Sequence, residues 1–286
     1  MPDQKVLRSH PSPRALLEKY DLRAKKSWGQ NFLGDEEILD AIARLAVEAR
    51  GEPVVELGAG LGHLTARLLA HGGAVTAVER DRDMARVLRG ELGDAVTLLE
   101  ADAARLDYRA LAGGGRIAVV GNLPYHLTSP ILFSLLDQAE HVSRAVFLVQ
   151  EEVAERLAAS PGGKEWGLLS VLLQQRATVS LELRVPRGAF LPPPRVESAV
   201  VRVGFGAPLV PVEDPAWFRR VVKAGFAQRR KVLPNALAGA GLGVQEPILA
   251  ALAAVSIDPR RRGETLTVEE WAALARALPK PAAAPR

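Results

Sequence analysis

The segment Gly121–Tyr125 (GNLPY) places two hydrogen-bond acceptors beside an aromatic ring. The side-chain oxygen of Asn122 and the backbone carbonyl of Leu123 can face one point, and Pro124 stiffens the turn. Tyr125 offers a flat face on which a base could stack. Methylation of an exocyclic amine requires such a pair of acceptors, because binding both N–H groups draws the nitrogen toward tetrahedral geometry and frees its lone pair. The alternative is a plain turn followed by a core tyrosine, which this segment taken alone would favour.

A glycine-rich run, Glu56–Gly62 (ELGAGLG), predicts a ligand-binding turn. Glycines let the backbone approach a ligand closely, and the helix expected after them offers its N-terminus. A dinucleotide-binding G-x-G-x-x-G pattern would need another glycine at position 63, where the chain has His63. Glu79 and Asp102 end the next two apolar segments, and a carboxylate in such a place can accept both hydroxyls of a ribose. The three features together predict a nucleoside-type ligand, although each one alone would fit an ordinary strand–helix turn.

Short apolar segments alternate with helical patterns between residues 35 and 159, which predicts a parallel, doubly wound sheet. The expected strands are Pro53–Leu57, Ala74–Val78, Ala95–Leu99, Ile117–Val120 and Ala145–Val149. The expected helices are Asp35–Ala49, Leu61–Ala70, Asp81–Leu92, Pro130–Leu136 and Glu151–Ala159. After a helix at Leu168–Gln175, residues 179–184 and Ser198–Val203 predict two late strands, added antiparallel at the sheet edge. Everything after Asp214 is expected to be helical.

Two further segments could contact a nucleic acid. Phe190 opens a proline-rich loop, FLPPPRVES, and could close the second face of a base pocket, or it could be a buried side chain in a rigid loop. Six basic residues beside an apolar helix stripe could contact phosphates, or could form an ordinary solvated face. They are Arg219, Arg220, Lys223, Arg229, Arg230 and Lys231.

Composition and charge exclude several classes. The 286 residues are 48% hydrophobic and 24% charged, as in a folded globular protein. The absence of cysteine removes thiolate chemistry, and the five histidines show no metal spacing, so no metal is expected. No membrane span or secretory signal is recognised, which favours a cytoplasmic protein. The net charge is +4 in residues 1–30, −7 in 31–181 and +7 in 182–286, which favours a polyanionic partner.

The order and spacing of these motifs resemble the ribosomal RNA adenine N6-dimethyltransferases. The resemblance runs from about Lys25 to about Leu237 and is strongest to the bacterial small-subunit (KsgA) type. It is carried by QNFL at 30–33, ELGAGLGHLT, VERD, EADA, GNLPYHLTSPIL, FLPPPRVESAVV and FAQRRK. It implies a class I methyltransferase fold, Rossmann-like, with a seven-stranded mostly parallel sheet and a small α-helical C-terminal domain. The implied reaction uses S-adenosylmethionine to dimethylate two adjacent adenosines in a hairpin loop near the 3′ end of 16S rRNA.

The resemblance also implies roles for residues and segments. The cofactor contacts would be Asn31, Leu33, Gly58, Gly60, Glu79, Arg80, Asp102, Ala103 and Asn122. The target adenine would be held by Asn122, Leu123 and Pro124 and sandwiched by Tyr125 and Phe190. The implied segments are an N-terminal extension (1–24), a catalytic domain (25–207), a helical rRNA-positioning or subunit-positioning domain (208–278) and a disordered tail (279–286). The protein would act as a monomer on the small (30S) subunit or its late precursor, without membrane or metal.

Three alternatives remain open from the sequence. The first is a large-subunit rRNA adenine methyltransferase of the resistance type, which shares the NLPY motif. The second is a mainly non-catalytic assembly factor that binds the immature small subunit. The third is a nicotinamide-dependent oxidoreductase, which His63 at the position of the expected glycine disfavours.

Overall fold

The computed structural model describes residues 10–25, 28–124 and 127–280. The chain divides into two compact units. Unit 1 comprises Met1–Ala154 with Val179–Phe205, and unit 2 comprises Glu155–Thr178 with Gly206–Arg286. The predicted catalytic domain, 25–207, differs from unit 1 at two places. Residues 155–178 belong to the compact unit of the C-terminal helices, and the predicted N-terminal extension belongs to unit 1.

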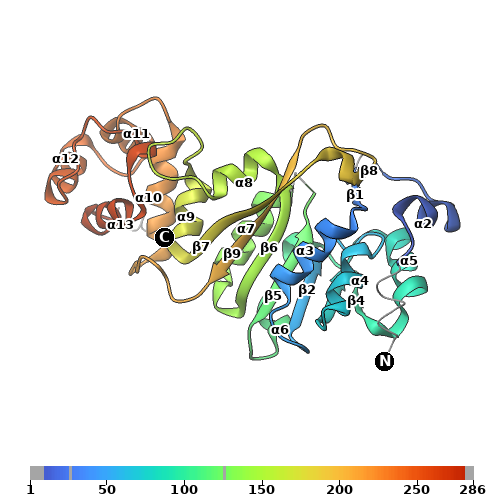
Figure 1. The fold of residues 1–286 in the computed structure, drawn as a ribbon. Helices are drawn as coiled ribbons and strands as arrows, with labels where there is room; N and C mark the ends of the chain where they lie inside the picture. Colours follow the sequence, from blue (N-terminus) through green and yellow to red (C-terminus); the bar gives the residue numbers. More distant parts are fainter. Residues whose placement is uncertain (1–9, 26–27, 125–126, 281–286) are drawn as a thin grey trace. The chain divides into compact units, whose positions relative to one another are not determined.

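A seven-stranded sheet with the order β4-β3-β2-β5-β6-β9-β7 organises unit 1 (Figure 1). Its strands are β2 (Pro53–Leu57), β3 (Ala74–Val78), β4 (Thr97–Leu99), β5 (Ile117–Asn122), β6 (Val142–Gln150), β7 (Ala177–Val185) and β9 (Ser198–Phe205). The strands from β4 to β6 pair in parallel, and β9 runs antiparallel to β6. The predicted mostly parallel sheet with an antiparallel addition is therefore confirmed. The chain moves outward from β2 to β4 and returns to β5 on the other side of β2, which creates a topological switch point between β2 and β5.

Helices follow the parallel strands, as the alternating pattern predicts. They are α3 (Glu36–Ala46), α4 (His63–Ala70), α5 (Arg82–Leu92), α6 (Tyr108–Ala112), α7 (Thr128–Asp137) and α8 (Glu151–Leu157). The apolar sides of α3 and α4 join side chains from one face of the sheet in a single core cluster. Successive strand residues point to opposite faces, so neighbours such as Val119 and Val120, both fully buried, show that the sheet is covered on both sides.

Local backbone geometry explains where element boundaries differ from the predicted ones. The helix expected from Leu61 begins at His63, because Gly62 has a left-handed φ of 86° and occupies the N-cap position. The strand expected from Ala95 begins at Thr97, because Gly93–Ala95 form a 3₁₀ turn. The edge strand β7 keeps the predicted period of two, since burial alternates along it.

Two very short strands bring distant parts of unit 1 together. β1 (Phe32–Leu33) pairs antiparallel with β8 (Phe190–Leu191), and the two lie side by side in Figure 1. In this register Leu33 faces Phe190 and Phe32 faces Leu191. The pairing therefore places the QNFL segment beside the beginning of the proline-rich loop.

Unit 2 is helical, with α9 (Leu168–Arg176), α10 (Pro215–Ala227), α11 (Leu233–Gly239), α12 (Gln245–Ala254) and α13 (Val268–Ala277). The segment before α9 belongs here for a physical reason. The buried Trp166 indole N–H donates to the Leu266 carbonyl at 3.0 Å, and α9 packs against α10 and α13. Of the predicted disordered tail, residues 281–286 lie outside the described chain, whereas Lys280 Nζ lies 2.8 Å from Asp214 Oδ2.

Gly225 lets the Trp271 ring of α13 pack directly on the backbone of α10. A Cβ on Gly225 would overlap that ring. We expect Gly225→Ala to lower the free energy of unfolding by about 1–3 kcal/mol, as overpacking does, although alanine is the better helix former. Urea denaturation followed by circular dichroism measures this. Gly206→Ala is the control, because among the described residues no atom lies within 4 Å of its added Cβ. Equal midpoints for both variants would contradict the expectation.

Candidate active site

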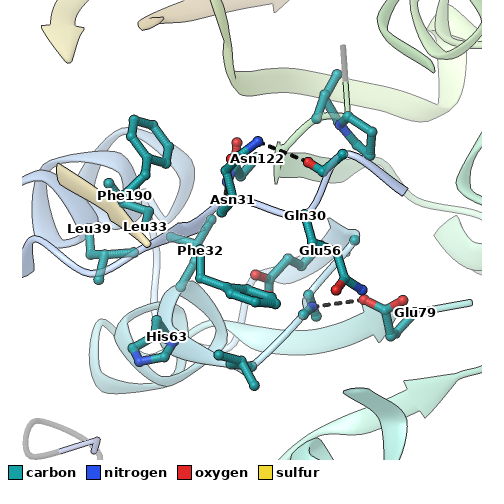
Figure 2. A pocket seen from close by; sticks show the side chains of 18 of the residues that line it. Gln30, Asn31, Phe32, Leu33, Leu39, Glu56, His63, Glu79, Asn122 and Phe190 are labelled. Carbon is teal, nitrogen blue, oxygen red and sulfur yellow. Dashed lines mark hydrogen bonds between the residues drawn. The ribbon is translucent and has the colours of Figure 1, made fainter. Parts of the chain in front are cut away.

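The candidate site lies at the carboxyl ends of β2, β3 and β5, at the switch point of the sheet. A cavity opens between the glycine-rich turn, the end of β5 and the β1–β8 pair (Figure 2). Its lining includes Trp28, Gln30, Asn31, Phe32, Leu33, Glu56, Gly58, Gly60, Leu61, His63, Glu79, Asn122, Leu123, Pro124 and Phe190. An adjoining cavity shares Trp28, Gly58, Glu79, Leu123 and Pro124 and adds Arg80, Ala101, Asp102, Ala103, Leu127 and Ile131. The structure thus brings the three sequence motifs to one place.

The glycine-rich turn depends on backbone that other residues rarely adopt. Gly58, Gly60 and Gly62 have φ values of 72°, 56° and 86°, and a Cβ on Gly60 would lie 3.3 Å from the Phe32 ring. The Gly60 N–H donates to Glu79 Oε2 at 2.8 Å. The turn is therefore shaped by a carboxylate from the neighbouring strand as well as by its own glycines.

Glu79 holds the turn and keeps a polar face toward the cavity. Its second oxygen, Oε1, accepts the Asp81 N–H at 2.7 Å. Burial raises the pKa of Glu79, and the N–H bonds that it accepts from Asp81, Gly60 and Arg80 act in the opposite direction. A carboxylate oxygen can accept more than one hydrogen bond, so Glu79 can also receive hydroxyl groups of a bound nucleoside.

Glu56, which lines the cavity, is a buried carboxyl. In the sequence it stands out only as the first residue of the glycine-rich run. It is 2% exposed, and its Oε2 accepts the Thr65 hydroxyl at 2.6 Å. Burial raises the pKa of Glu56 to about 8, the Thr65 bond opposes this, and the nearby charge of Glu79 adds to it. Without a cationic ligand, Glu56 is therefore mainly neutral at pH 7.

The raised pKa makes the stability of the ligand-free protein depend on pH. Folded Glu56 keeps its proton up to about pH 8, whereas an unfolded glutamate ionises near pH 4, so the free energy of unfolding falls as pH rises between these values. Glu56→Gln cannot ionise. We expect its melting-temperature advantage over the wild type to grow from about pH 5 to about pH 8.5. Differential scanning calorimetry checks this, with the exposed Glu37→Gln as control; an advantage independent of pH would refute it.

Asp102 stands beside Arg80 and Ala103 in the adjoining cavity. Its Oδ1 accepts the Ala104 N–H at 3.0 Å and caps the turn at Ala103–Arg105. Its Oδ2 lies 3.8 Å from an Arg80 guanidinium nitrogen, and the Asp102 side chain is one-third exposed. The carboxylate is thus fixed in orientation but still reachable from the cavity.

Asn122 ends β5, and a hydrogen bond to the Asn31 backbone orients its carboxamide. Its Nδ2 donates to the Asn31 backbone carbonyl at 2.9 Å. A carbonyl can only accept, so the NH₂ group must face Asn31, and Oδ1 faces away from it. This bond also ties the QNFL segment to the end of β5.

Backbone hydrogen bonds fix the positions of the residues after Asn122. The Leu123 N–H donates to the Leu148 carbonyl of β6 at 3.1 Å, and the Leu127 N–H donates to the Pro124 carbonyl at 2.8 Å. Leu123 and Pro124 line both cavities. Tyr125, predicted to stack on the target base, lies outside the described residues.

Phe190 and Leu33 form the apolar wall of the cavity. They face each other across the β1–β8 pair and are 6% and 5% exposed. Phe190 also belongs to the main core cluster, as the interpretation of a buried side chain predicts, and a role in closing a base pocket stays a prediction. Asn31 contributes through its backbone carbonyl, while its side-chain NH₂ donates to the Gly29 carbonyl at 3.0 Å.

Trp28 was not singled out from the sequence, although it lines both cavities. Its side chain is exposed, and the Lys25 ammonium and the Arg80 guanidinium each lie 5.5 Å from its ring centroid. An aromatic residue among cations immediately before QNFL is the signal that could have identified it.

The six predicted RNA-contacting cations of unit 2 do not share one environment. The Arg229 guanidinium donates to the Lys164 and Trp166 carbonyls at 2.8 and 3.1 Å, which gives it a structural role. Arg219 is half-buried, whereas Arg220, Lys223, Arg230 and Lys231 are exposed.

The described residues contain neither a candidate metal cluster nor a candidate membrane-spanning helix. No group of three or more His, Asp or Glu side chains there could hold a metal ion. Among the same residues, no helix combines the length and apolar character that crossing a bilayer requires.

Several known proteins are similar to this chain over most of its length. Ribosomal RNA small subunit methyltransferase A of Anaeromyxobacter dehalogenans is 69% identical over 279 residues, which cover 94% of this chain and 98% of the relative. The Myxococcus xanthus protein of the same name is 54% identical over 269 residues, covering 93% and 95%.

Two solved structures share the fold. The 23S rRNA methyltransferase ErmE matches with a TM-score of 0.67 and 27% identity, covering 87% of this chain and 99% of that one. A dimethyladenosine transferase from Plasmodium falciparum matches with a TM-score of 0.72 and 22% identity, covering 85% and 95%. The sheet order, with its antiparallel addition, is that of a class I methyltransferase.

The model of the ribosomal RNA adenine dimethylase family matches residues 21–278, which include the glycine-rich turn, Glu79, Asp102, Asn122 and the whole of α13. With a match of this extent, the chain belongs to the ribosomal RNA adenine dimethylase family.

Proposed function

We propose that this protein is the small-subunit enzyme of its family. It uses S-adenosylmethionine to methylate N6 of two adjacent adenosines, twice each, in a hairpin loop near the 3′ end of 16S rRNA. The orientation of Asn122 carries the proposal, because Asn122 lines the cavity and its amide oxygen is turned away from Asn31. The protein would act in the cytoplasm, as a monomer, on the small subunit or its late precursor.

The residues of the two cavities fit S-adenosylmethionine. Three glycines with left-handed φ leave the turn after β2 without side chains, and a ligand can approach its backbone closely. Glu79 would accept the ribose hydroxyls, and Asp102, with Arg80 and Ala103, would hold the adenine. The half-exposed Trp28 lies where the two cavities meet and would cover the nucleoside. When bound, this cofactor supplies a methyl group on a positively charged sulfur.

The chain prepares the target amine through two acceptors. Asn122 Oδ1 and the Leu123 carbonyl oxygen would each accept one N–H of the adenine amine. The nitrogen lone pair is then withdrawn from the ring and directed toward the cofactor cavity, which positions it for attack. The Asn31 carbonyl maintains this orientation by holding the Asn122 NH₂ group at 2.9 Å.

Dimethylation constrains this arrangement further. After one transfer the nitrogen keeps a single N–H, so only one of the two acceptors remains bonded during the second transfer. The site must therefore accommodate one methyl group beside either Asn122 Oδ1 or the Leu123 carbonyl. The base must also leave its stack, because both acceptors lie at a strand end inside a cavity.

The full-length similarity supports the small subunit over the large one. The small-subunit relatives are 69% and 54% identical, whereas the 23S rRNA enzyme is 27% identical. The family membership leaves the nicotinamide-dependent alternative without support. A mainly structural assembly role is disfavoured by the intact acceptor pair at the end of β5.

The test is methyl transfer in vitro from labelled S-adenosylmethionine to two acceptors. One is small subunits from cells that lack the protein, and the other is deproteinised 23S rRNA. We expect incorporation to approach four methyl groups per small subunit, because two adenosines each receive two, and to be negligible on 23S rRNA. Preferred methylation of 23S rRNA would support the resistance-type alternative. Subunit binding without methylation would support the assembly-factor alternative.

A further inference from the structure

The N-terminal strap, defined here as residues 10–25, packs across the glycine-rich turn. Its helix α2 (Pro13–Lys19) buries Leu16 completely in a cluster with Phe32, Leu61, Met84 and Val87. Three prolines among residues 1–13 would be typical of a loose chain end. Residues 10–13 instead belong to the packed part of unit 1, with Pro13 buried at the start of α2.

Two histidines fasten this strap by reciprocal hydrogen bonds. His10 Nε2 lies 2.9 Å from the Leu61 carbonyl, and His63 Nε2 lies 2.9 Å from the Pro11 carbonyl. Because carbonyls only accept, both imidazoles must carry their proton on Nε2. The rings meet edge to face, with centroids 4.8 Å apart.

These hydrogen bonds act on both sides of Gly62 in the glycine-rich turn. Leu61 and His63 are the two neighbours of Gly62, whose left-handed φ of 86° starts α4. Both line the same cavity as Gly60 and Glu79, and Figure 2 shows His63 on the wall of that cavity. A shift of the strap would therefore move the backbone that is expected to contact the cofactor.

At the other end of the strap, Lys25 is connected to Glu79 through Asp81. Lys25 Nζ lies 2.7 Å from carboxylate oxygens of both Asp81 and Asp83. The Asp81 N–H in turn donates to Glu79 Oε1 at 2.7 Å. The strap thus contacts the glycine-rich turn at its first residue and the ribose-binding carboxylate, through Asp81, at its last.

We propose that His10 and His63 are positioning residues that hold the Gly58–Gly62 turn in its cofactor-binding shape, and that a second proton on either imidazole weakens this hold. The proposal rests on the cofactor site of the proposed function. Neither histidine is assigned a catalytic role. They act through Leu61 and the backbone of the turn.

The surroundings disfavour a second proton, and therefore a positive charge, on either imidazole ring. His63 and His10 face each other, and Arg67 of α4 is near both. Lys19 of α2 also faces His10. Glu91 of α5 and the hydrogen bonds to the Leu61 and Pro11 carbonyls act in the opposite direction and favour a charge. Burial lowers the pKa of His10, and burial together with the charge of His10 lowers the pKa of His63 to about 4. Since a released imidazole ionises near pH 6.5, acidification below that value favours release of the strap.

The first experiment measures binding of S-adenosylhomocysteine by titration calorimetry near pH 7.5 with the full-length protein. We expect His10→Ala to weaken binding about tenfold, the worth of roughly one hydrogen bond. His10→Gln keeps an N–H donor at nearly the same reach and should bind within about threefold of the wild type. The turnover number at saturating cofactor should change little in either variant. Wild-type binding by His10→Ala would overturn the proposal.

The second experiment compares pH profiles of the same binding between about pH 7.5 and pH 5. The double variant His10→Gln/His63→Gln cannot take up the two protons, so its loss of affinity on acidification should be at least about fivefold smaller than that of the wild type. His71→Gln, at the other end of α4, is the control and should keep the full loss. Equal losses in the double variant and the wild type would overturn the proposal. Failure of the wild type to bind at pH 7.5 would instead refute the cofactor site of the proposed function.

Discussion

Asn122→Ala should abolish most methyl transfer while leaving the protein folded and able to bind cofactor. The substitution removes the amide oxygen that would accept one N–H of the target amine. Removal of one preorganised hydrogen-bonding group from a transition state costs about a hundred- to a thousandfold in rate. It also removes the bond to the Asn31 carbonyl, at 2.9 Å. We expect affinity for S-adenosylhomocysteine to fall by no more than about fivefold, the worth of about one neutral hydrogen bond.

Single-turnover methylation of small subunits measures this effect, and subunit binding is measured separately. Asn235→Ala is the matched control, because it removes an amide that bonds Gln245 within unit 2. Asn122→Asp is informative as well, since its carboxylate can accept an N–H but cannot donate to Asn31. We expect it to fall between the wild type and the alanine variant. An Asn122→Ala protein with more than about a third of the wild-type rate would contradict the proposed two-acceptor mechanism.

Glu79→Ala should have the second largest effect, mainly on cofactor affinity. The change leaves the Gly60 and Asp81 N–H groups without their acceptor, at 2.8 and 2.7 Å, and removes the proposed ribose contact. Charged hydrogen bonds of this kind are worth more than neutral ones. We therefore expect the Kd for S-adenosylhomocysteine to rise about a hundredfold, with a smaller change in the turnover number at saturating cofactor.

We also expect cofactor binding to depend on pH through Glu79. Burial raises the pKa of free Glu79, whereas ribose hydroxyls donating to it would favour its ionised form and lower that pKa. Affinity should therefore fall as pH drops through the pKa of Glu79 in the free protein, and Glu79→Gln should lack the part of the fall that Glu79 causes. Binding can be followed by the fluorescence of Trp28, which is the one tryptophan of unit 1 and lines both cavities. The other tryptophans, Trp166, Trp217 and Trp271, are buried in unit 2. Fluorescence unchanged by saturating ligand, with binding shown by calorimetry, would contradict the placement of Trp28.

The elements that repeat a local pattern were predictable from the sequence. Strands buried on both faces, such as β5 and β6, are continuous apolar runs, and helices such as α5 carry an apolar stripe. Once those elements alternate, the carboxyl ends of the strands must share one edge of the sheet. The positions of Glu79, Asp102 and Asn122 around one site therefore follow from the sequence.

The features that depend on single long-range contacts were not predictable. β1 and β8 have two residues each, which is too short for any periodicity, and only their pairing places Leu33 against Phe190. The assignment of α9 to unit 2 depends on contacts such as Trp166 with Leu266. The contact of His10 with Leu61 spans 51 positions and has no local signature.

The proposed dimethylation of 16S rRNA is tested most directly by mass spectrometry of 16S rRNA from cells that lack the protein. We expect two adjacent N6,N6-dimethyladenosines near the 3′ end to be missing from these cells. They should return with the wild-type gene and remain absent with the Asn122→Ala gene. Fully dimethylated adenosines at those positions in the deletion strain, or their restoration by Asn122→Ala, would contradict the proposal.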